Sequence, residues 1–504
     1  MRGVLTLAVG LALVGAVPPA AAQDAGPPSA HEEQRLGWGP CPAAQRELIR
    51  AGARCAKVKV PLDYADPAGP AVEITVSRVQ ARSAKRRGIL LSNPGGPGGT
   101  GLNSTLTLRR TLGRTADAYD LIGFDPRFLG ESSPVRCAPA GPARPPGPSS
   151  SARADFDRSV RAARDTVRRC FAPEGNAALL PHASTRNVAR DMDLIRKVLG
   201  EPRLSYYGVS YGADLGAVFA EMFPRSVDRL VLDSATDPAA TQYELFRRSG
   251  RPLEGALDEW AAWTARRPSY GLGRTRAQVR AGVERLLERA TRRPVAIGGT
   301  RLDAPLLRLI LRQFVQHGEH DAALAAVVRD LRRAAEGRPV EPGPELAAML
   351  ELLESPALAD GMVGGALFMC GDGGWPAGGW PQDPEAYWRN IVRDKAALPV
   401  FGPMTSGMTA PCAFWGSEPG EAGTPVGNAV PALILHARRD ANVPYAGAVA
   451  LHRKMTASRL VTADVRAHGV YGRAAEGFRP VPCADRAVNA YLDGGALPTR
   501  DLAC

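Results

Sequence analysis

The sequence contains no C-x-x-C pair, although it has eight cysteines. Zinc ribbons and thioredoxin-like redox motifs therefore have no support, and nothing else in the sequence indicates a metal or a cofactor. An even number of cysteines is typical of a disulfide framework in an exported chain. The eight residues are Cys41, Cys55, Cys137, Cys170, Cys370, Cys412, Cys483 and Cys504.

Beyond its first residues, the sequence has no apolar run long enough to cross a membrane. At the start, Arg2 precedes the apolar stretch GVLTLAVGLALVGAV and an A-x-A site formed by Ala20 and Ala22. This pattern predicts a signal peptide over residues 1–22 and a secreted mature protein. A membrane anchor is the alternative, but the apolar run is shorter than a bilayer span. No cysteine follows the cleavage site, so a lipid anchor is not indicated.

No nucleic-acid-binding motif accompanies the basic composition, which gives a formal net charge of +12. The arginines are interspersed with acidic residues along the expected helices, as is typical of a solvated surface. We therefore expect no nucleic-acid partner. Weak attraction to anionic cell-wall polymers is left open.

Strand and helix patterns alternate in the first half of the chain. Short apolar runs predict strands at residues 72–79, 88–92, 119–124, 203–207 and 229–233. Apolar residues at helical spacing predict a helix that runs through residues 188–199 and ends at Gly200. This alternation predicts an α/β protein with a mostly parallel sheet.

The strand pattern stops after Pro238, and amphipathic helices follow. These are expected over residues 243–266, 276–292, 302–336 with a break near Gly318, and 345–354. Strand patterns return at residues 431–436 and 459–467. The expected organisation is therefore a sheet-based core of residues 23–238 and 431–504, with a mainly helical lid of residues 239–430 inserted between strands.

The stretch YYGVSYGADLG places Ser210 between Gly208 and Gly212. The pattern G-x-S-x-G is typical of a sharp strand-to-helix turn that exposes a nucleophilic serine at the amino end of a helix. Glycines are needed in such a turn because side chains there would clash. The motif alone is weak, since chance produces it readily in a chain rich in glycine.

Two later residues stand where an α/β hydrolase carries the partners of its nucleophile. A serine hydroxyl needs a histidine that takes its proton and an acid that orients the histidine. In this fold the chain order is serine, acid, histidine. Asp440 follows the apolar strand in ALILHARRDANVP, and His468 follows the last strand in VRAHGVYG. Asp233, at the end of an earlier strand, is the alternative acid.

The glycine-rich stretch LLSNPGGPGGTG follows an expected strand and suits an oxyanion loop. By position, the backbone N–H groups of Gly96 and Tyr211 would face the oxyanion. A tight turn is the simpler alternative. A phosphate cradle is less favoured because the stretch lacks the G-K-[ST] ending of a P-loop.

Seven motifs occur together: NPGGPGG, YDLIGFDPR, YYGVSYG, CGDGGWP, PCAFW, HGVYG and AVNAYLDGGALP. In this combination the chain resembles the secreted bacterial tripeptidyl aminopeptidases, α/β hydrolases related to prolyl iminopeptidases, over essentially the whole mature chain. The resemblance implies a serine peptidase that removes short peptides from free N-termini. It also implies Ser210, Asp440 and His468 as the catalytic triad.

The resemblance further implies disulfides between neighbours in the sequence, which are Cys41–Cys55, Cys137–Cys170, Cys370–Cys412 and Cys483–Cys504. Two positions depart from the family pattern. Phe128 stands where the family has a glycine, and Asp214 stands where a larger residue is more usual. Both positions bear on the substrate pocket.

An enzyme that acts from a free N-terminus must bind its ammonium group, and a buried ammonium needs a carboxylate partner. Asp372 in CGDGGWP is the best candidate, with Trp375 as a wall of the same subsite. An ordinary turn aspartate is the alternative. For the whole chain, an exported carboxylesterase with the same triad is the alternative function, and a non-catalytic binding protein on a hydrolase scaffold is the third.

Overall fold

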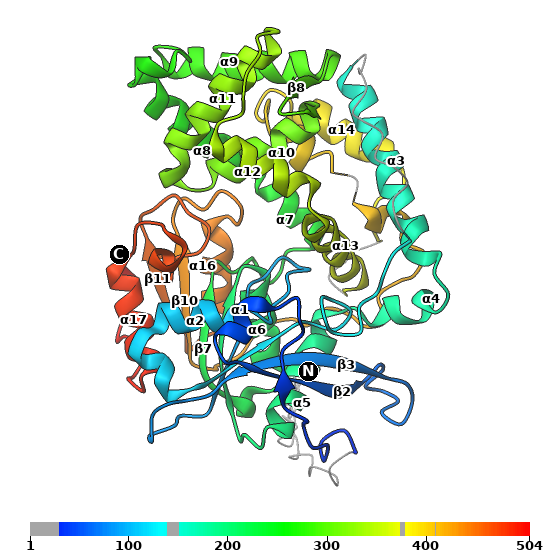
Figure 1. The fold of residues 1–504 in the computed structure, drawn as a ribbon, viewed down its shortest axis with the longest axis vertical. Helices are drawn as coiled ribbons and strands as arrows, with labels where there is room; N and C mark the ends of the chain where they lie inside the picture. The colour runs from blue at the N-terminus through cyan, green and yellow to red at the C-terminus, as the bar shows by residue number, and fades with distance from the viewer. Residues whose placement is uncertain (1–29, 139–150, 373–378, 409) are drawn as a thin grey trace, which may run out of the picture.

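A ten-stranded sheet occupies one half of the molecule, and a group of helices occupies the other (Figure 1). The computed structural model describes residues 30–138, 151–372, 379–408 and 410–504. The signal peptide expected over residues 1–22 lies outside the described residues, as does Trp375. Among the residues described, no helix is long and apolar enough to span a membrane.

The large sheet is mostly parallel. Its strands are β1 (Gly39–Pro40), β2 (Arg54–Pro61), β3 (Ala71–Val79), β4 (Ile89–Asn93), β5 (Asp120–Phe124), β6 (Leu204–Val209), β7 (Val227–Asp233), β10 (Ala432–Ala437), β11 (Arg459–Ala463) and β12 (Leu502–Ala503). They are ordered β1-β2-β3-β5-β4-β6-β7-β10-β11-β12. The pairs β1/β2, β2/β3 and β3/β5 are antiparallel, and the pairs from β5/β4 onward are parallel. The α/β class expected from the sequence is confirmed.

Helices cover both faces of this sheet. On one face, α5 (Thr185–Val198), α6 (Tyr211–Met222) and α16 (Tyr445–Lys454) pack against strand residues such as Leu91 and Ile434. On the other face, α2 (Ser104–Leu112) and α17 (Pro482–Leu492) pack against the intervening residues, such as Leu90 and Leu435. Because side chains alternate between the two faces, β4 and β10 are buried at every position and read as continuous apolar runs.

Between β7 and β10 the chain is mainly helical, and we call residues 239–430 the lid. It contains α7 (Gln242–Arg248), α8 (Gly250–Ala265), α9 (Arg276–Arg292), α10 (Ala304–Val315), α11 (Asp321–Ala335), α12 (Pro344–Glu354), α13 (Pro356–Gly371), α14 (Pro384–Asp394), α15 (Gly402–Thr405) and a hairpin of β8 (Val295–Ile297) with β9 (Thr300–Leu302). The lid has its own apolar core, which includes Trp260, Leu307 and Val328.

One helix from outside the lid sequence packs against it. α3 (Ala152–Phe171) runs beside the lid in Figure 1, and its Phe156 clusters with Tyr387 and Ile391 of α14. The lid is therefore attached to the rest of the molecule along its side as well as through its two chain connections.

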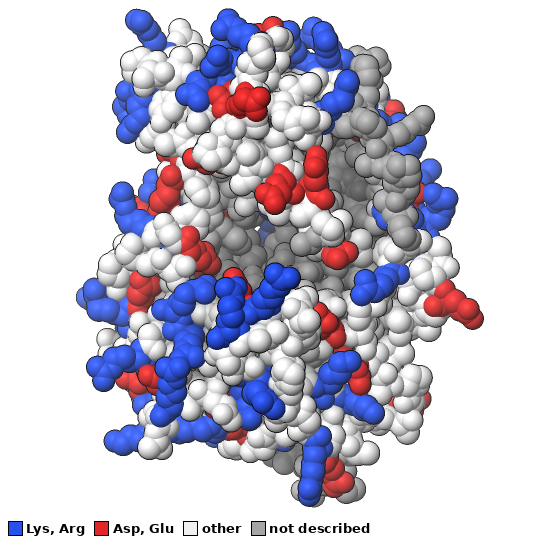
Figure 2. All heavy atoms as spheres, in the orientation of Figure 1, with Lys and Arg blue, Asp and Glu red and all other residues white. Residues whose placement is uncertain are grey.

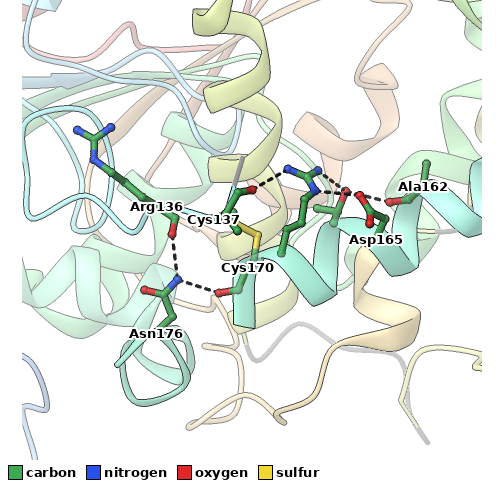
Figure 3. The surroundings of a disulfide bond; sticks show 9 residues. Arg136, Cys137, Ala162, Asp165, Cys170 and Asn176 are labelled. Atoms are coloured by element: carbon green, nitrogen blue, oxygen red, sulfur yellow. Dashed lines mark hydrogen bonds and ion pairs between the residues drawn. A yellow bond between two sulfur atoms is a disulfide. The ribbon is translucent and has the colours of Figure 1, made fainter. Parts of the chain in front are cut away.

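Four disulfides pair all eight cysteines: Cys41–Cys55, Cys137–Cys170, Cys370–Cys412 and Cys483–Cys504. This is the pairing that the family resemblance implied. Figure 3 shows the second of them at the end of α3, where the Asn176 amide donates hydrogen bonds to the carbonyls of Arg136 and Cys170 at 3.1 and 2.8 Å. The disulfide thus holds the segment before residue 139 against α3.

Basic and acidic side chains are interspersed over the face shown in Figure 2, and the surface is hollowed between the lid and the sheet half. Many of the charges are paired. Arg153, for example, forms ion pairs with both Asp157 and Glu385. This distribution agrees with the solvated surface expected from the sequence.

Candidate active site

Ser210 occupies the sharp turn between β6 and α6. Its backbone has φ 57° and ψ −127°, a conformation that residues other than glycine seldom adopt. A Cβ on Gly208 would lie 2.1 Å from the carbonyl oxygen of Gly212, and a Cβ on Gly212 would lie 2.3 Å from that of Asn93. Any side chain at either glycine would therefore clash, as the motif predicts, and Ser210 stands at the amino end of the helix.

His468 and Asp440 form a hydrogen-bonded pair. Nδ1 of His468 lies 2.7 Å from Oδ2 of Asp440, and the other carboxylate oxygen accepts the N–H groups of Asn442 and Val443 at 2.8 and 2.9 Å. Burial alone would raise the pKa of Asp440, but His468 and these contacts hold it below the usual value. Burial alone would lower the pKa of His468, but Asp440 raises it above the usual value.

The loop that carries His468 lies beside the turn that carries Ser210. The backbone N–H of Ser210 donates to the carbonyl of Asp233 at 2.8 Å, and the N–H of Gly469 donates to the hydroxyl of Ser234 at 3.0 Å. Both segments are thus attached to consecutive residues at the end of β7. The structure therefore brings the three residues of the predicted triad to the same edge of the sheet.

Asp233, the alternative acid, binds backbone instead of the imidazole. Its buried carboxylate accepts the N–H groups of Val470 and Tyr471 at 2.9 and 2.8 Å and the hydroxyl of Ser234 at 3.0 Å. Burial raises the pKa of Asp233, although these hydrogen bonds oppose the rise. The geometry thus favours Asp440 as the acid that orients His468 and gives Asp233 the role of holding the following loop.

The glycine-rich loop after β4 closes against the nucleophile. The N–H of Gly95 donates to Oδ1 of Asn93 at 2.9 Å, and a Cβ on Gly95 would lie 3.0 Å from Cβ of Ser210. The same Cβ would lie 3.3 Å from the backbone nitrogen of Tyr211, whose N–H belongs to the first turn of α6 and has no intrahelical acceptor. The predicted donor Gly96 is the next residue in this loop. Gly95, which lies against Ser210, was not predicted from the sequence.

The carboxylate of Asp125 also binds this glycine-rich loop. Oδ1 of Asp125 accepts the N–H groups of Gly101 and Leu102 at 2.9 and 3.0 Å, and Oδ2 accepts that of Glu131 at 3.0 Å. Asp125 therefore joins the glycine-rich loop to the loop after β5. This role of Asp125 was not predicted from the sequence, although the motif YDLIGFDPR contains the residue.

A cavity of about 320 Å³ is lined by Tyr211 and by three aspartates, Asp214, Asp237 and Asp372. The hydroxyl of Thr185 donates to Asp372 and lies 2.9 Å from the hydroxyl of Tyr211. The structure therefore brings Asp372 close to the residue that follows the nucleophile. Trp375, the predicted wall of this subsite, is not among the described residues.

Asp214 lies one turn into α6, where Oδ1 accepts the N–H of Thr236 at 2.9 Å. Burial raises the pKa of Asp214 to about 7, and Asp372 adds to the rise, while Thr236 and His468 oppose it. A carboxyl group with this pKa is half protonated near neutral pH. A cation placed beside it would favour the ionised form.

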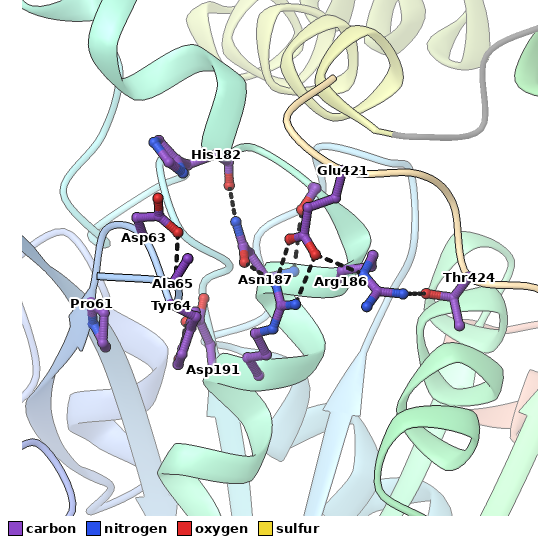
Figure 4. A network of polar contacts seen from close by, with 12 residues as sticks. Pro61, Asp63, Tyr64, Ala65, His182, Arg186, Asn187, Asp191, Glu421 and Thr424 are labelled. Atoms are coloured by element: carbon purple, nitrogen blue, oxygen red, sulfur yellow. Dashed lines mark hydrogen bonds and ion pairs between the residues drawn. The ribbon is translucent and has the colours of Figure 1, made fainter. Parts of the chain in front are cut away.

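One wall of the cavity is fixed by charged residues of α5 (Figure 4). Glu421 accepts hydrogen bonds from Arg186 at 3.0 Å and from Arg190 at 2.8 Å, and Arg186 also donates to the hydroxyl of Thr424 at 2.7 Å. Arg186 and Thr424 both line the cavity. The segment before β10 is thereby fastened over the amino end of α5.

Phe128 keeps the backbone conformation that a glycine would adopt. Its φ is 70°, and the residue is 2% exposed, packed in the same apolar core as Leu91 and Ile434. The neighbouring Arg127 is also buried, and its guanidinium donates to both carboxylate oxygens of Asp191, at 2.8 and 2.6 Å. Tyr64 donates to the same carboxylate at 2.8 Å. Phe128 therefore keeps the backbone of the turn that a glycine would form, and its ring lies in the core.

Two family models match the chain. One is described as the alpha/beta hydrolase fold and matches residues 88–285, and the other is described as TAP-like protein and matches residues 398–504. Tripeptidyl aminopeptidase of Streptomyces coelicolor is 34% identical and covers 93% of this chain and 86% of its own length. The chain belongs to the tripeptidyl aminopeptidase family of α/β hydrolases. It is therefore a serine hydrolase.

Two further relatives in Mycobacterium tuberculosis carry different names. Serine protease Hip1 is 29% identical and covers 99% of this chain and 96% of its own length. Carboxylesterase B is 30% identical and covers 96% of this chain and 92% of its own length. The relatives of this chain thus include proteins named as peptidases and one named as an esterase. Their names alone do not decide between a peptide and an ester substrate.

Proposed function

We propose that this protein is a secreted aminopeptidase that releases short peptides, chiefly tripeptides, from free N-termini. The acidic cavity carries the proposal, because Tyr211, the residue after Ser210, lines it together with Asp214, Asp237 and Asp372. A cavity lined by carboxyl groups is complementary to a substrate whose acyl part bears an ammonium group. An ester without positive charge would gain nothing from them.

The chemistry follows from the roles of the triad. Ser210 attacks the carbonyl carbon of the scissile bond while His468 takes the proton of its hydroxyl. His468 then gives that proton to the leaving amine, and an acyl-enzyme remains on Ser210. Asp440 holds the imidazole through Nδ1, which leaves Nε2 to face the nucleophile. Water attacks the acyl-enzyme in the same way and frees the peptide.

The tetrahedral intermediates carry a negative charge on the former carbonyl oxygen. The N–H groups of Tyr211 and Gly96 are the proposed donors to this oxyanion. Fixed donors are effective because they need no reorganisation as charge develops. The hydrogen bonds that Asn93 and Asp125 make to the glycine-rich loop support that fixed geometry.

The proposed ammonium partner is Asp372, at the lid end of the cavity. An extended tripeptide spans about 10 Å, so its ammonium group lies well away from the attacked carbonyl. A carboxylate fixed at a set distance from Ser210 would therefore determine how many residues are removed. The disulfide Cys370–Cys412 holds the end of α13, next to Asp372, and supports such a fixed distance.

Secretion is supported by the apolar stretch and A-x-A site in residues 1–22 and by the four disulfides. We place the core of the mature enzyme in residues 23–238 and 431–504, with residues 239–430 as the lid over the cavity.

An exported carboxylesterase is the second candidate, because Carboxylesterase B of Mycobacterium tuberculosis is 30% identical over 96% of this chain. The purified protein should be assayed on tetrapeptide amides with free N-termini and on p-nitrophenyl butyrate, with products identified by mass. The expected result is release of tripeptides, which Ser210→Ala abolishes without loss of folding. Ester hydrolysis with no peptide cleavage would favour the esterase.

A further inference from the structure

Asp214 is the acidic residue of the cavity that is tied most closely to the nucleophile. Its backbone N–H donates to the carbonyl of Ser210 at 3.3 Å, which is the first turn of α6. Ser210 itself lies just before the helix, and the charge of His468 acts to lower the pKa of Asp214, so this carboxyl group is within electrostatic range of the imidazole. The carboxyl group of Asp214 therefore serves the part of the cavity nearest the attacked carbonyl.

The ammonium group of a tripeptide cannot reach that part of the cavity. In an extended chain it lies about 10 Å from the scissile carbonyl, because each residue adds roughly 3.3 Å or more. The side chain of the residue that contributes the carbonyl is attached to the adjacent carbon. Asp372 and Asp214 are thus suited to two different groups of one substrate.

We propose that Asp214 is a specificity-determining residue that selects a lysine or arginine side chain at the residue whose carbonyl is attacked. This inference rests on the proposed function, since it assumes that the acyl part of the substrate enters the cavity. The expected substrates are peptides whose released part bears two positive charges, the α-ammonium group and the lysine or arginine side chain.

The lining of the cavity suits such a side chain. Ala217 and Val218, farther along α6, and Leu451 of α16 present apolar walls beside Asp214. A long cationic side chain buries its methylene groups against apolar surface and directs its charged end to a polar partner. The volume of about 320 Å³ equals that of about ten water molecules in the liquid, which is ample for one lysine or arginine side chain.

The charged neighbours determine how this selection depends on pH. The groups that share the cavity or its field with Asp214 are Asp372 just after α13, His468 after β11, Arg186 on α5 and Asp237 after β7. Arg186 is engaged by Glu421, and Asp237 by Arg248 at 2.6 Å. Burial raises the pKa of Asp214 to about 7 in the empty cavity. Selection of a cationic side chain is therefore expected to strengthen as the pH rises through 7.

Four small esters test the proposal whether the enzyme prefers peptides or esters. They are the methyl esters of lysine and norleucine, each with a free and with an acetylated α-amino group. The two acetylated esters differ in the presence of the ε-ammonium group on the side chain. The two norleucine esters differ in whether the α-amino group is charged or acetylated. The measured quantity is kcat/KM between pH 6 and 8 for the wild type, for Asp214→Asn and for the control Asp360→Asn, an exposed aspartate of α13 that does not line the cavity. The folding of both variants is checked by thermal unfolding.

In the acetylated pair, the wild type is expected to prefer lysine over norleucine by about tenfold or more at pH 8, and less at pH 6. Asp214→Asn is expected to bring this ratio close to one at every pH, while Asp360→Asn keeps it. A ratio that Asp214→Asn leaves unchanged would overturn the proposal. So would a loss confined to the free-amine norleucine ester, because Asp214 would then serve the α-ammonium.

The aminopeptidase function fails by a different result. Equal cleavage of free and acetylated peptides, with the lysine preference retained, would remove the proposed N-terminal recognition and leave the role of Asp214 intact. Strict dependence on a free N-terminus without any lysine preference would support the proposed N-terminal recognition and overturn the role of Asp214.

Discussion

Oδ2 of Asp440 lies 2.7 Å from Nδ1 of His468, while the carboxylate of Asp233 binds the backbone N–H groups of Val470 and Tyr471 just beyond that histidine. Two buried aspartates from neighbouring strands therefore act on one loop in different ways. One orients the imidazole ring, and the other holds the backbone that carries it.

Substitution of each aspartate should separate these roles. Asp440→Asn is expected to lower kcat by about 10⁴-fold with the fold retained, because the imidazole loses the partner that fixes its tautomer. Asp233→Asn leaves an amide N–H facing backbone donors, so it should lower the melting temperature together with activity. Steady-state kinetics and thermal unfolding of both variants check this. A larger kinetic loss in Asp233→Asn at unchanged stability would assign the acid to Asp233.

The pH profile should report the same pair. The base must be neutral to take a proton, and Asp440 raises the pKa of His468 above its usual 6.5 despite burial. The acid limb of kcat/KM for an uncharged ester is therefore expected above pH 6.5. In the residual activity of Asp440→Asn the limb should move to lower pH, since the effect of burial on the imidazole is then no longer opposed by Asp440. An acid limb at the same pH in both proteins would contradict this account.

Much of the site could be predicted because its geometry is local. Gly208 and Gly212 leave no room for side chains around Ser210, so the motif specifies the turn by itself. The choice between Asp440 and Asp233 is different, because both follow buried strands and only the packing of the later loop separates them. The approach of Gly95 to Ser210 likewise depends on which strands are neighbours, which apolar runs do not encode.

The strands and helices show the same division. The buried central strands were found as apolar runs, but β2 was missed because three of its eight residues are charged and exposed and it lies near the sheet edge. The single helix expected over residues 243–266 was wrong, since α7 ends at Arg248 and α8 begins at Gly250. Pro252 lacks an N–H and fits the first turn of a new helix, which allows the break.

Asp372, just after α13, can be tested against a carboxylate on that helix. Asp372→Asn is expected to raise KM for peptides with free N-termini by about tenfold or more, because an ammonium group loses its charged partner. Hydrolysis of p-nitrophenyl butyrate should change little. Asp360→Asn, at an exposed position of α13, is the matched control and should leave both reactions unchanged. Equal losses on peptide and ester would show that Asp372 only supports the fold.

The disulfide beside Asp372 should matter for substrate binding as well as for stability. Replacement of Cys370 and Cys412 by serine opens a link between residues 42 positions apart and is expected to cost about 2–4 kcal/mol of unfolding free energy. It should also raise KM for peptides, since the end of α13 is no longer held. The matched control replaces Cys483 and Cys504, neither of which lines the cavity, and should lower stability without a change in KM. Chemical denaturation and kinetics on both double variants decide this.

The central claim is that the enzyme recognises a free N-terminus. Its most direct test compares cleavage of one tetrapeptide amide before and after acetylation of the α-amino group, with the products identified by mass. The expected result is tripeptide release from the free peptide and essentially none from the acetylated one, because a neutral amide cannot replace an ammonium group as the partner of Asp372. Equal rates on the two peptides would contradict it.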